Sequence, residues 1–374
     1  MVNKKNILFF ADRLPPLIGG MEMHACYFLK YFENHYEFPL LAVITKDVNG
    51  KNIIFSKKDN IVIDISKLPE LYSPMFIFFN SGRWIEEFKE IRKAFPKAYF
   101  IYRTGGNEIL KAPLIKKKIS EHSLRQAYWV KIINNYIDVL ITNSFYTEER
   151  LCKLGIVTQF IRCVGGVNIS ALKESKTLSK TSITIFCAAR FVPYKNHKLL
   201  IAVIHKLKLC GYNIKVKLAG DGPLLKQVKD LVFKYNLDSV VEFLGVLDND
   251  VVYREIANSH IYMQLSSDYI TQVSGGSYIH SEGMGRSILE AITVGTFVIA
   301  GKSGALSEIV TKDRGILVEP NNIEQIVNNI LPILKTMPIA KLECTDKFSW
   351  DKVFVNYEKL FKSFNESIIS NGEI

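Results

Sequence analysis

Short apolar segments alternate with segments of helical periodicity through the second half of the chain, and this order constrains the fold most. The apolar segments are nearly continuous, as expected for strands that helices cover on both faces. Such repeated alternation predicts a parallel, doubly wound α/β sheet. The alternating segments are, in chain order, 183–189, 195–211, 214–220, 223–237, 240–245 and 249–259.

The first half follows the same pattern less regularly, beginning with a strand-like segment at 7–11 and a helical one at 23–32. A length of 374 residues suggests two domains at about 150 residues each. We expect an N-terminal domain over 1–172, a polar linker at 173–182 and a second domain over 183–349. Two Rossmann-like domains in tandem would face a central cleft between the carboxyl ends of their sheets, where ligands usually bind.

The charge of the chain is unusual, with 48 Lys and Arg against 37 Asp and Glu, a net charge of +11. Residues 1–175 hold 25 basic residues against 17 acidic ones, so they carry +8 of this excess. Such a balance predicts an anionic partner. The hydrophobic fraction of 48% is that of a globular protein and argues against disorder.

Cysteine usage and hydropathy indicate the compartment. None of the six cysteines forms a C-x-x-C pair, which fits neither a zinc site nor a disulfide framework. The apolar run at 7–11 is too short for a signal peptide, so we expect none, and the sequence has no apolar run of 18 residues. These features predict a cytoplasmic protein.

The strongest motif is Ser281-Glu282-Gly283-Met284-Gly285-Arg286-Ser287-Ile288-Leu289-Glu290-Ala291. Its glycines allow close approach of the backbone to a ligand, and the helix that follows offers free N–H groups to a phosphate. Glu282 and Glu290 could accept sugar and ribose hydroxyls. On spacing alone, a helix with favourable acids in its first turns is equally consistent.

Two further motifs follow strands that begin the two domains. Arg190 and Lys195 flank a turn after the segment 183–189, where two cations could neutralise a diphosphate. Gly19 and Gly20 follow the segment 7–11 and suit backbone approach to a phosphate. Each motif alone is also consistent with an ordinary turn.

Taken in order, these motifs resemble the family 4 retaining glycosyltransferases of the GT-B fold. The resemblance runs from Gly-Gly-x-Glu-x-His, through Arg190 with Lys195 and the Gly-Asp-Gly-Pro of residues 220–223, to Glu-x7-Glu. It ends near Trp350, and it implies that the helical segment 350–374 crosses back to the N-terminal domain.

The resemblance implies a role for each matched residue. Arg190 and Lys195 would bind the donor diphosphate and stabilise it as it leaves. Glu290 would hold the ribose, and Glu282 would contact hydroxyls of the transferred sugar. The remaining donor-binding residues would be Gly19, Gly20, Gly283, Met284, Gly285 and Ser287.

The acceptor side departs from the family pattern. Relatives often carry His or Asp after the strand that ends here at Tyr102, whereas this chain continues Arg103-Thr104-Gly105-Gly106-Asn107-Glu108. Asn107 or Glu108 would stand in, and His24 would lie on the same side. The catalytic residues would then be Arg190, Lys195, Glu282 and Glu108.

Metal ions and nucleic acid are not expected. The D-x-D sequence at 248–250 precedes a predicted helix, where acids favour the helix dipole, and the histidines show no H-x3-H pair. No nucleic-acid-binding motif appears. Lys111–Ile119 mixes cations with apolar residues, which suits peripheral contact with the inner, anionic face of the cytoplasmic membrane, although a solvated helix face fits equally.

The sequence therefore predicts a metal-independent retaining glycosyltransferase. It would move a sugar from a nucleotide-diphosphate donor to a hydroxyl of a glycan or lipid-linked glycan in surface polysaccharide assembly. Two alternatives remain: a phosphorylase, synthase or epimerase of the same fold that acts on sugar nucleotides, and a non-catalytic subunit that binds glycan or nucleotide.

Overall fold

A computed structural model describes residues 5–12, 14, 20–47, 49–55, 60–113, 119–168, 178, 182–336 and 345–370, with backbone alone at 345, 346 and 365–370. The chain divides into two compact units. Unit 1 comprises Met1–Gly166, Gln272–Tyr278 and Trp350–Ile374, and unit 2 comprises Val167–Thr271 and Ile279–Ser349. The predicted linker at 173–182 lies outside the described residues except for residues 178 and 182.

Unit 1 is built on an eight-stranded sheet in the order β4-β3-β2-β1-β5-β6-β7-β8. Its strands are parallel except β3, which pairs antiparallel with both neighbours at one edge of the sheet. The strands are β1 (Ile7–Phe10), β2 (Leu40–Lys46), β3 (Asn52–Ile54), β4 (Ile61–Val62), β5 (Phe76–Phe79), β6 (Tyr99–Arg103), β7 (Val139–Thr142) and β8 (Gln159–Arg162).

Helices cover both faces of this sheet and create two hydrophobic cores. One core includes Trp84 and Trp129, and the other lies beneath α1 and α13. The helices are α1 (Gly20–Phe32), α2 (Leu68–Leu71), α3 (Phe88–Ala94), α4 (Asn107–Lys111), α5 (His122–Tyr136), α6 (Phe145–Lys153) and α13 (Trp350–Ser370), with a 3₁₀ helix at Gly82–Glu87.

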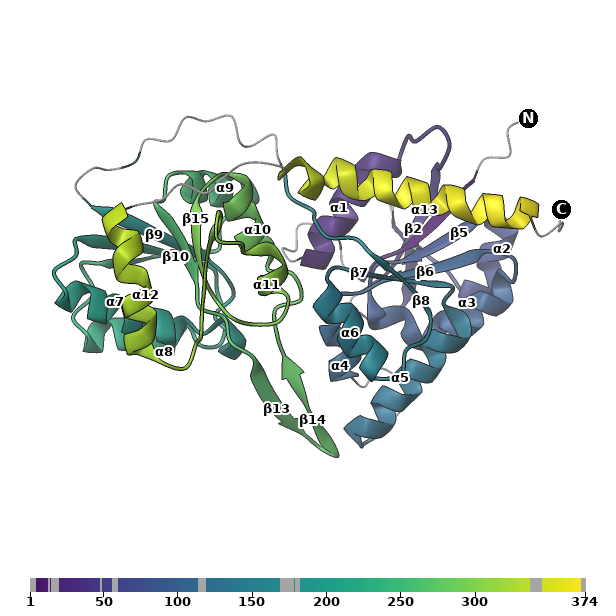
Figure 1. Cartoon of the computed structure of the whole chain (residues 1–374). Helices are drawn as coiled ribbons and strands as arrows, with labels where there is room; N and C mark the ends of the chain where they lie inside the picture. Colours follow the sequence, from purple (N-terminus) through teal and green to yellow (C-terminus); the bar gives the residue numbers. More distant parts are fainter. Residues whose placement is uncertain are drawn as a thin grey trace. The chain divides into compact units, whose positions relative to one another are not determined.

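The C-terminal helix α13 packs on α1 through aromatic side chains, and the two helices lie side by side in Figure 1. The Trp350 ring stacks on Tyr27 with centroids 4.9 Å apart. The Trp350 ring also lies where a side chain on Gly166 would stand, since a Cβ there would be 2.5 Å from it. Residues from the end of the chain therefore complete the core of its first unit.

Unit 2 is built on a six-stranded sheet in the order β11-β10-β9-β12-β15-β16, with every pair parallel. These strands are β9 (Ile183–Ala188), β10 (Ile214–Ala219), β11 (Val241–Gly245), β12 (Ile261–Gln264), β15 (Phe297–Gly301) and β16 (Gly315–Val318). The surrounding helices are α7 (His197–Leu209), α8 (Leu225–Lys234), α9 (Asn249–Ala257), α10 (Arg286–Thr293), α11 (Leu306–Ile309) and α12 (Ile323–Thr336). The parallel α/β architecture predicted from the alternation is confirmed.

A β-hairpin between β12 and α10 was not predicted. It consists of β13 (Tyr269–Val273) and β14 (Gly276–His280), which are joined by a turn in which Gly275 has φ +74°. Its tip, Gln272–Tyr278, belongs to unit 1, where the His122 backbone N–H donates to the Ser274 carbonyl oxygen at 2.9 Å. Its residues are mostly exposed, so it lacks the continuous apolar pattern that marks the buried strands.

Candidate functional site

The Glu282 carboxylate is the centre of a polar cluster at the carboxyl end of the unit 2 sheet. Its Oε1 atom accepts three hydrogen bonds, from Lys195 Nζ at 2.7 Å, Ser266 Oγ at 2.7 Å and Gln264 Nε2 at 2.9 Å. The other carboxylate oxygen, Oε2, makes no hydrogen bond to a described residue. One oxygen is therefore held in place, while the second remains available to a ligand.

Lys195 reaches this cluster from the turn after β9. A 3₁₀ turn at Pro193–Lys195 precedes Asn196, which adopts a left-handed conformation with φ +52°. Burial alone would lower the pKa of Lys195, but the adjacent Glu282 carboxylate raises that pKa above its ordinary value. Lys195 is therefore a cation at neutral pH, and only one of its three ammonium hydrogens is used by Glu282.

Arg190 lies on the same turn and differs from Lys195 in its surroundings. Its side chain is exposed and forms no ion pair with a described residue. Its guanidinium is thus free to take an anionic group, and its assignment to the donor diphosphate stays a prediction.

Glycines bring neighbouring loops into backbone contact around this turn. A Cβ on Gly220 would lie 2.2 Å from the Ala189 carbonyl oxygen, and one on Gly222 would lie 2.6 Å from that of Phe191. Since such contacts are sterically excluded, the loop after β10 can support the Arg190 turn only with glycine at both positions.

The end of β15 and the loop after it support Glu282 in the same way. A Cβ on Gly304 would lie 2.1 Å from the Glu282 carbonyl oxygen, and one on Gly301 would lie 2.1 Å from that of Ser266. The Ser303 hydroxyl accepts a bond from the Glu282 backbone N–H at 3.3 Å and donates to Asp268 at 2.7 Å. These residues were not predicted as part of the site, although their position at the carboxyl end of a strand of the same sheet is a usable signal.

The helix α10 begins directly after the glycines of the motif. Gly285 occupies the N-cap position with φ +73° and provides no side-chain cap, so the first N–H groups of α10 remain available to an anion. Gly283 and the largely buried Met284 form the approach to this helix end, and Ser287 lies in its first turn. The assignment of these residues to donor binding stays a prediction.

Glu290 lies one helical turn further along α10 and is 5% exposed. Its Oε1 is 3.1 Å from Arg286 Nε. Burial raises the pKa of Glu290, and the Arg286 charge opposes that shift. The assignment of Glu290 to the ribose stays a prediction.

In unit 1, Glu108 lines a pocket of about 510 Å³ at the carboxyl end of the sheet. Its Oε1 accepts hydrogen bonds from Thr104 Oγ1 at 2.8 Å and Tyr102 OH at 3.3 Å. An ion pair of Arg83 with Asp12, at 3.2 Å, contributes to the wall. The pocket is lined by Asp12, Met21, Ser81, Gly82, Arg83, Glu108, Pro113 and Trp129.

The structure separates Glu108 from the other acceptor-side predictions. Asn107 starts α4 beside Glu108 but does not line the pocket. His24 is fully buried, with Nε2 3.0 Å from the Tyr357 hydroxyl, and burial holds its pKa well below the ordinary value. Placing His24 on the acceptor side is corrected, because the periodicity of α1 turns it inward together with Phe28.

Three sequence-based predictions concern the start and the basic segment of unit 1. Gly19 and residues 114–118 lie outside the described residues. Gly20 begins α1, and a Cβ there would have nothing within 4 Å. Its approach to a phosphate stays a prediction.

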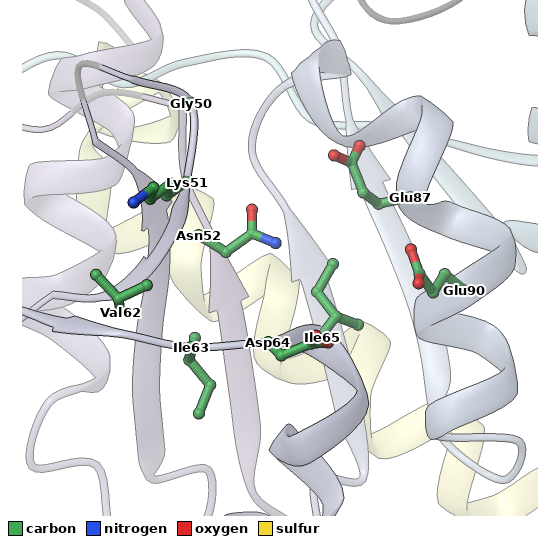
Figure 2. Close-up of a pocket in the computed structure, with 9 residues that line it drawn as sticks. All are labelled: Gly50, Lys51, Asn52, Val62, Ile63, Asp64, Ile65, Glu87 and Glu90. Carbon is green, nitrogen blue, oxygen red and sulfur yellow. The ribbon is translucent and has the colours of Figure 1, made fainter.

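A second hollow in unit 1, of about 400 Å³, contains none of the predicted site residues (Figure 2). Glu87 and Glu90 lie on its helical side, opposite Asn52. Glu87 forms a buried ion pair with Lys46 at 2.6 Å, and the Lys46 ammonium lies 4.4 Å from the Trp84 ring centroid. This pair lies at the end of β2, and packing within unit 1 accounts for it without a ligand.

Within the described part of the chain, no three His, Cys, Asp or Glu side chains are grouped so that they could hold a metal ion. No helix among these residues is long and apolar enough to cross a membrane.

Comparison with known proteins gives a family match in unit 2. Residues 168–342 match the model for "Glycosyl transferases group 1". An uncharacterized glycosyltransferase of Methanocaldococcus jannaschii is 28% identical over 255 residues, covering 66% of each chain. A GDP-mannose-dependent monoacylated alpha-(1-6)-phosphatidylinositol monomannoside mannosyltransferase of Corynebacterium glutamicum is 26% identical over 227 residues, covering 58% of this chain and 56% of that one.

A third relative is the gpi3 subunit of the phosphatidylinositol N-acetylglucosaminyltransferase of Schizosaccharomyces pombe, which is 27% identical over 50% of this chain. The match covers 39% of that relative. Matches to these curated relatives thus span from less than half to about two thirds of their length.

Two solved structures resemble the whole chain. Anabaena HepE in complex with UDP and glucose gives a TM-score of 0.73 at 17% identity, covering 96% of this chain and 100% of that one. The lipopolysaccharide outer core galactosyltransferase WaaB gives a TM-score of 0.67 at 16% identity, covering 98% of this chain and 99% of that one. The predicted GT-B fold is confirmed.

Proposed function

We propose, from the match of residues 168–342 to the group 1 glycosyl transferases, that this chain is a retaining glycosyltransferase that uses a nucleotide-diphosphate sugar. The observation that carries the proposal is the Glu282 carboxylate, which is anchored through Oε1 and open at Oε2. Oε2 would accept hydrogen bonds from hydroxyls of the donor sugar. The phosphates would lie against the adjacent N-terminus of α10.

The reaction requires stabilisation of the negative charge that develops on the leaving diphosphate. Lys195, Arg190 and the first N–H groups of α10 would supply this stabilisation without a metal ion, because they are positioned before the charge appears. The acceptor would attack on the face from which the diphosphate departs, and a phosphate oxygen would help remove the acceptor proton. This route retains the anomeric configuration.

The acceptor would bind unit 1 in the pocket beside Glu108. A sugar presents hydroxyls and an apolar ring face. The pocket suits both, because its carboxylate and its charged and polar walls can bind hydroxyls and Trp129 can pack against the ring. Relatives named for phosphatidylinositol-based acceptors support a lipid-linked glycan. With the +8 charge of residues 1–175, they also support peripheral binding at the inner membrane face during surface polysaccharide assembly.

The donor assignment is tested by screening sugar nucleotides for thermal stabilisation, followed by turnover of the best compound with EDTA present. Arg190→Ala and Lys195→Ala should abolish most turnover, whereas Lys206→Ala should not. Lys206 is a matched control because it is ion-paired to Glu324 at 2.6 Å on the outside of the same unit. Near-normal turnover in both site variants would refute the assignment, and loss of activity in EDTA restored by manganese would refute the metal-free mechanism.

The acceptor assignment is tested with Glu108→Gln. We expect lower transfer to acceptor with unchanged donor affinity, while Glu90→Gln, on an exposed position, leaves both unchanged. An equal loss of donor affinity in Glu108→Gln would contradict an acceptor role.

Separate measurements test the remaining alternatives and the membrane proposal. Phosphorolysis or epimerisation without glycan acceptor would favour a sugar-nucleotide enzyme of the same fold, and tight donor binding without turnover would favour a non-catalytic protein. Flotation with vesicles containing anionic lipid tests membrane contact, and absence of binding at low salt would remove that part of the proposal.

A further inference from the structure

Gln264 lies beneath the Glu282 loop and was not recognised in the sequence. It is the last residue of β12 and is 0% exposed. A buried amide is favourable only when its hydrogen-bonding groups are paired, and here both ends of the side chain have partners.

The partners determine the orientation of the amide. Nε2 donates to Glu282 Oε1 at 2.9 Å and to Ser266 Oγ at 3.0 Å. Oε1 lies 3.2 Å from the Ser287 hydroxyl and 3.2 Å from the Tyr262 hydroxyl, and accepts from both. The reverse orientation would place the amide oxygen against a carboxylate oxygen, so the network excludes it.

Gln264 thereby links two residues that lie on opposite sides of the glycines in the motif. Glu282 precedes Gly283 and Gly285, and Ser287 follows them. The glycines leave this segment conformationally free, so contacts from β12 must define the distance between its two ends. The buried amide supplies one contact to each end.

We propose that Gln264 is a positioning residue that orients Glu282 Oε2 toward the donor sugar. The inference rests on the proposed function. By holding Oε1, the amide prevents the carboxylate from turning and leaves Oε2 facing the ligand. By accepting a hydrogen bond from the Ser287 hydroxyl, the amide also directs that O–H inward, so Ser287 would meet a donor phosphate through its backbone N–H.

This role predicts a selective loss of affinity. Glu282 would contact the sugar, whereas Lys195, Arg190 and the α10 N-terminus would contact the diphosphate. Gln264→Leu should therefore weaken binding of the sugar nucleotide by about tenfold or more, and binding of the corresponding nucleoside diphosphate by less than about twofold. A merely structural role would weaken both ligands together.

A second variant tests the same role by pH and covers the case in which Gln264→Leu does not fold. Gln264→Glu is nearly isosteric but places a second carboxyl group against Glu282, and Lys195 neutralises only one of the two charges, so the pair would share a proton. Sugar-nucleotide affinity in Gln264→Glu should be weak at about pH 8 and recover toward about pH 5.5. The exposed Gln325→Glu is the matched control and should follow the wild-type profile.

The experiment uses the full chain and the sugar nucleotide that gives the largest thermal shift, with its nucleoside diphosphate as second probe, in isothermal titration. Equal losses for both probes, or no loss for either, would overturn the role of Gln264, as would a Gln264→Glu profile parallel to that of Gln325→Glu. Failure of the proposed function is distinguishable, because the wild-type chain would then bind no sugar nucleotide, and the role of Gln264 would fall with it.

Discussion

Lys195 Nζ lies 2.7 Å from Glu282 Oε1, and this ion pair joins the turn after β9 to the loop before α10 within unit 2. Both side chains are largely buried, with 13% and 6% of their surfaces exposed. Because the two residues are 87 positions apart, the pair also fixes the relative placement of two segments that carry the candidate site.

The first prediction concerns the energetics of this pair. Lys195→Met leaves the Glu282 carboxylate buried without its cation, which should lower the free energy of unfolding by about 3 kcal/mol. The double variant Lys195→Met/Glu282→Gln should recover most of that loss, because no buried charge remains. Urea unfolding of the wild type, Lys195→Met, Glu282→Gln and the double variant measures the coupling, and additive effects would show that the pair contributes nothing to stability.

Arg190 should behave differently, because its exposed side chain has no ion-pair partner among the described residues. We expect Arg190→Ala to change the free energy of unfolding by less than about 0.5 kcal/mol. The loss of a charge-assisted hydrogen bond should reduce kcat/KM by roughly 10- to 150-fold. Steady-state kinetics of Arg190→Ala and Arg190→Lys test this. Partial activity in the lysine variant would agree with an electrostatic role, and unchanged kcat/KM in both would argue against one.

The third prediction concerns the close approach at Gly304. Gly304 and Gly245 both have positive φ, of +51° and +68°, but a Cβ on Gly245 would meet nothing within 4 Å. Gly245→Ala should therefore cost only about 1–2 kcal/mol, from backbone conformation. Gly304→Ala should lower the free energy of unfolding by about 1–3 kcal/mol more than Gly245→Ala does, because its methyl group would displace the Glu282 backbone. Thermal unfolding and sugar-nucleotide binding should both distinguish the variants. Equal effects would mean that the contact is easily relieved.

A fourth prediction concerns acid sensitivity of unit 2 through His197. This side chain is 3% exposed, stacks on Phe191 with centroids 4.0 Å apart, and neither ring nitrogen bonds to a described residue. Burial, with the nearby Lys195 charge, lowers the pKa of His197 to about 3. The unfolded chain binds the proton near pH 6.5, so stability is present above that pH and is lost as pH falls from 6.5 toward 3.

Lowering the pH from about 7.5 to about 5 should thus reduce the free energy of unfolding by about 2 kcal/mol through His197. His197→Phe should remove this part of the pH dependence. His205→Phe is the matched control, since His205 also stacks on an aromatic ring, that of Tyr235, at 4.4 Å. Urea unfolding at both pH values measures the difference, and identical pH dependence in wild type and His197→Phe would contradict the assignment.

The fold was largely predictable because it follows from local patterns. Continuous apolar strands alternating with amphipathic helices require a two-sided parallel sheet, and both sheets are of this kind apart from the antiparallel β3, which lies next to the edge strand β4. The hairpin of β13 and β14 was not predictable in the same way, because its exposed strands carry no apolar periodicity. The burial of His24 also depends on a distant element, since Tyr357 and α13 complete the core around it.

The sequence by itself determined the two α/β units and the segments that carry Arg190, Lys195, Glu282 and Glu290, because strand–helix order and glycine-containing turns are local properties. Only the tertiary structure decided how these segments meet. The Glu282 carboxylate gains Lys195 from one strand end and Gln264 from another, and Gly304 supports its backbone from a third. Those contacts exist because parallel strands distant in sequence end at the same edge of one sheet, which no local pattern specifies.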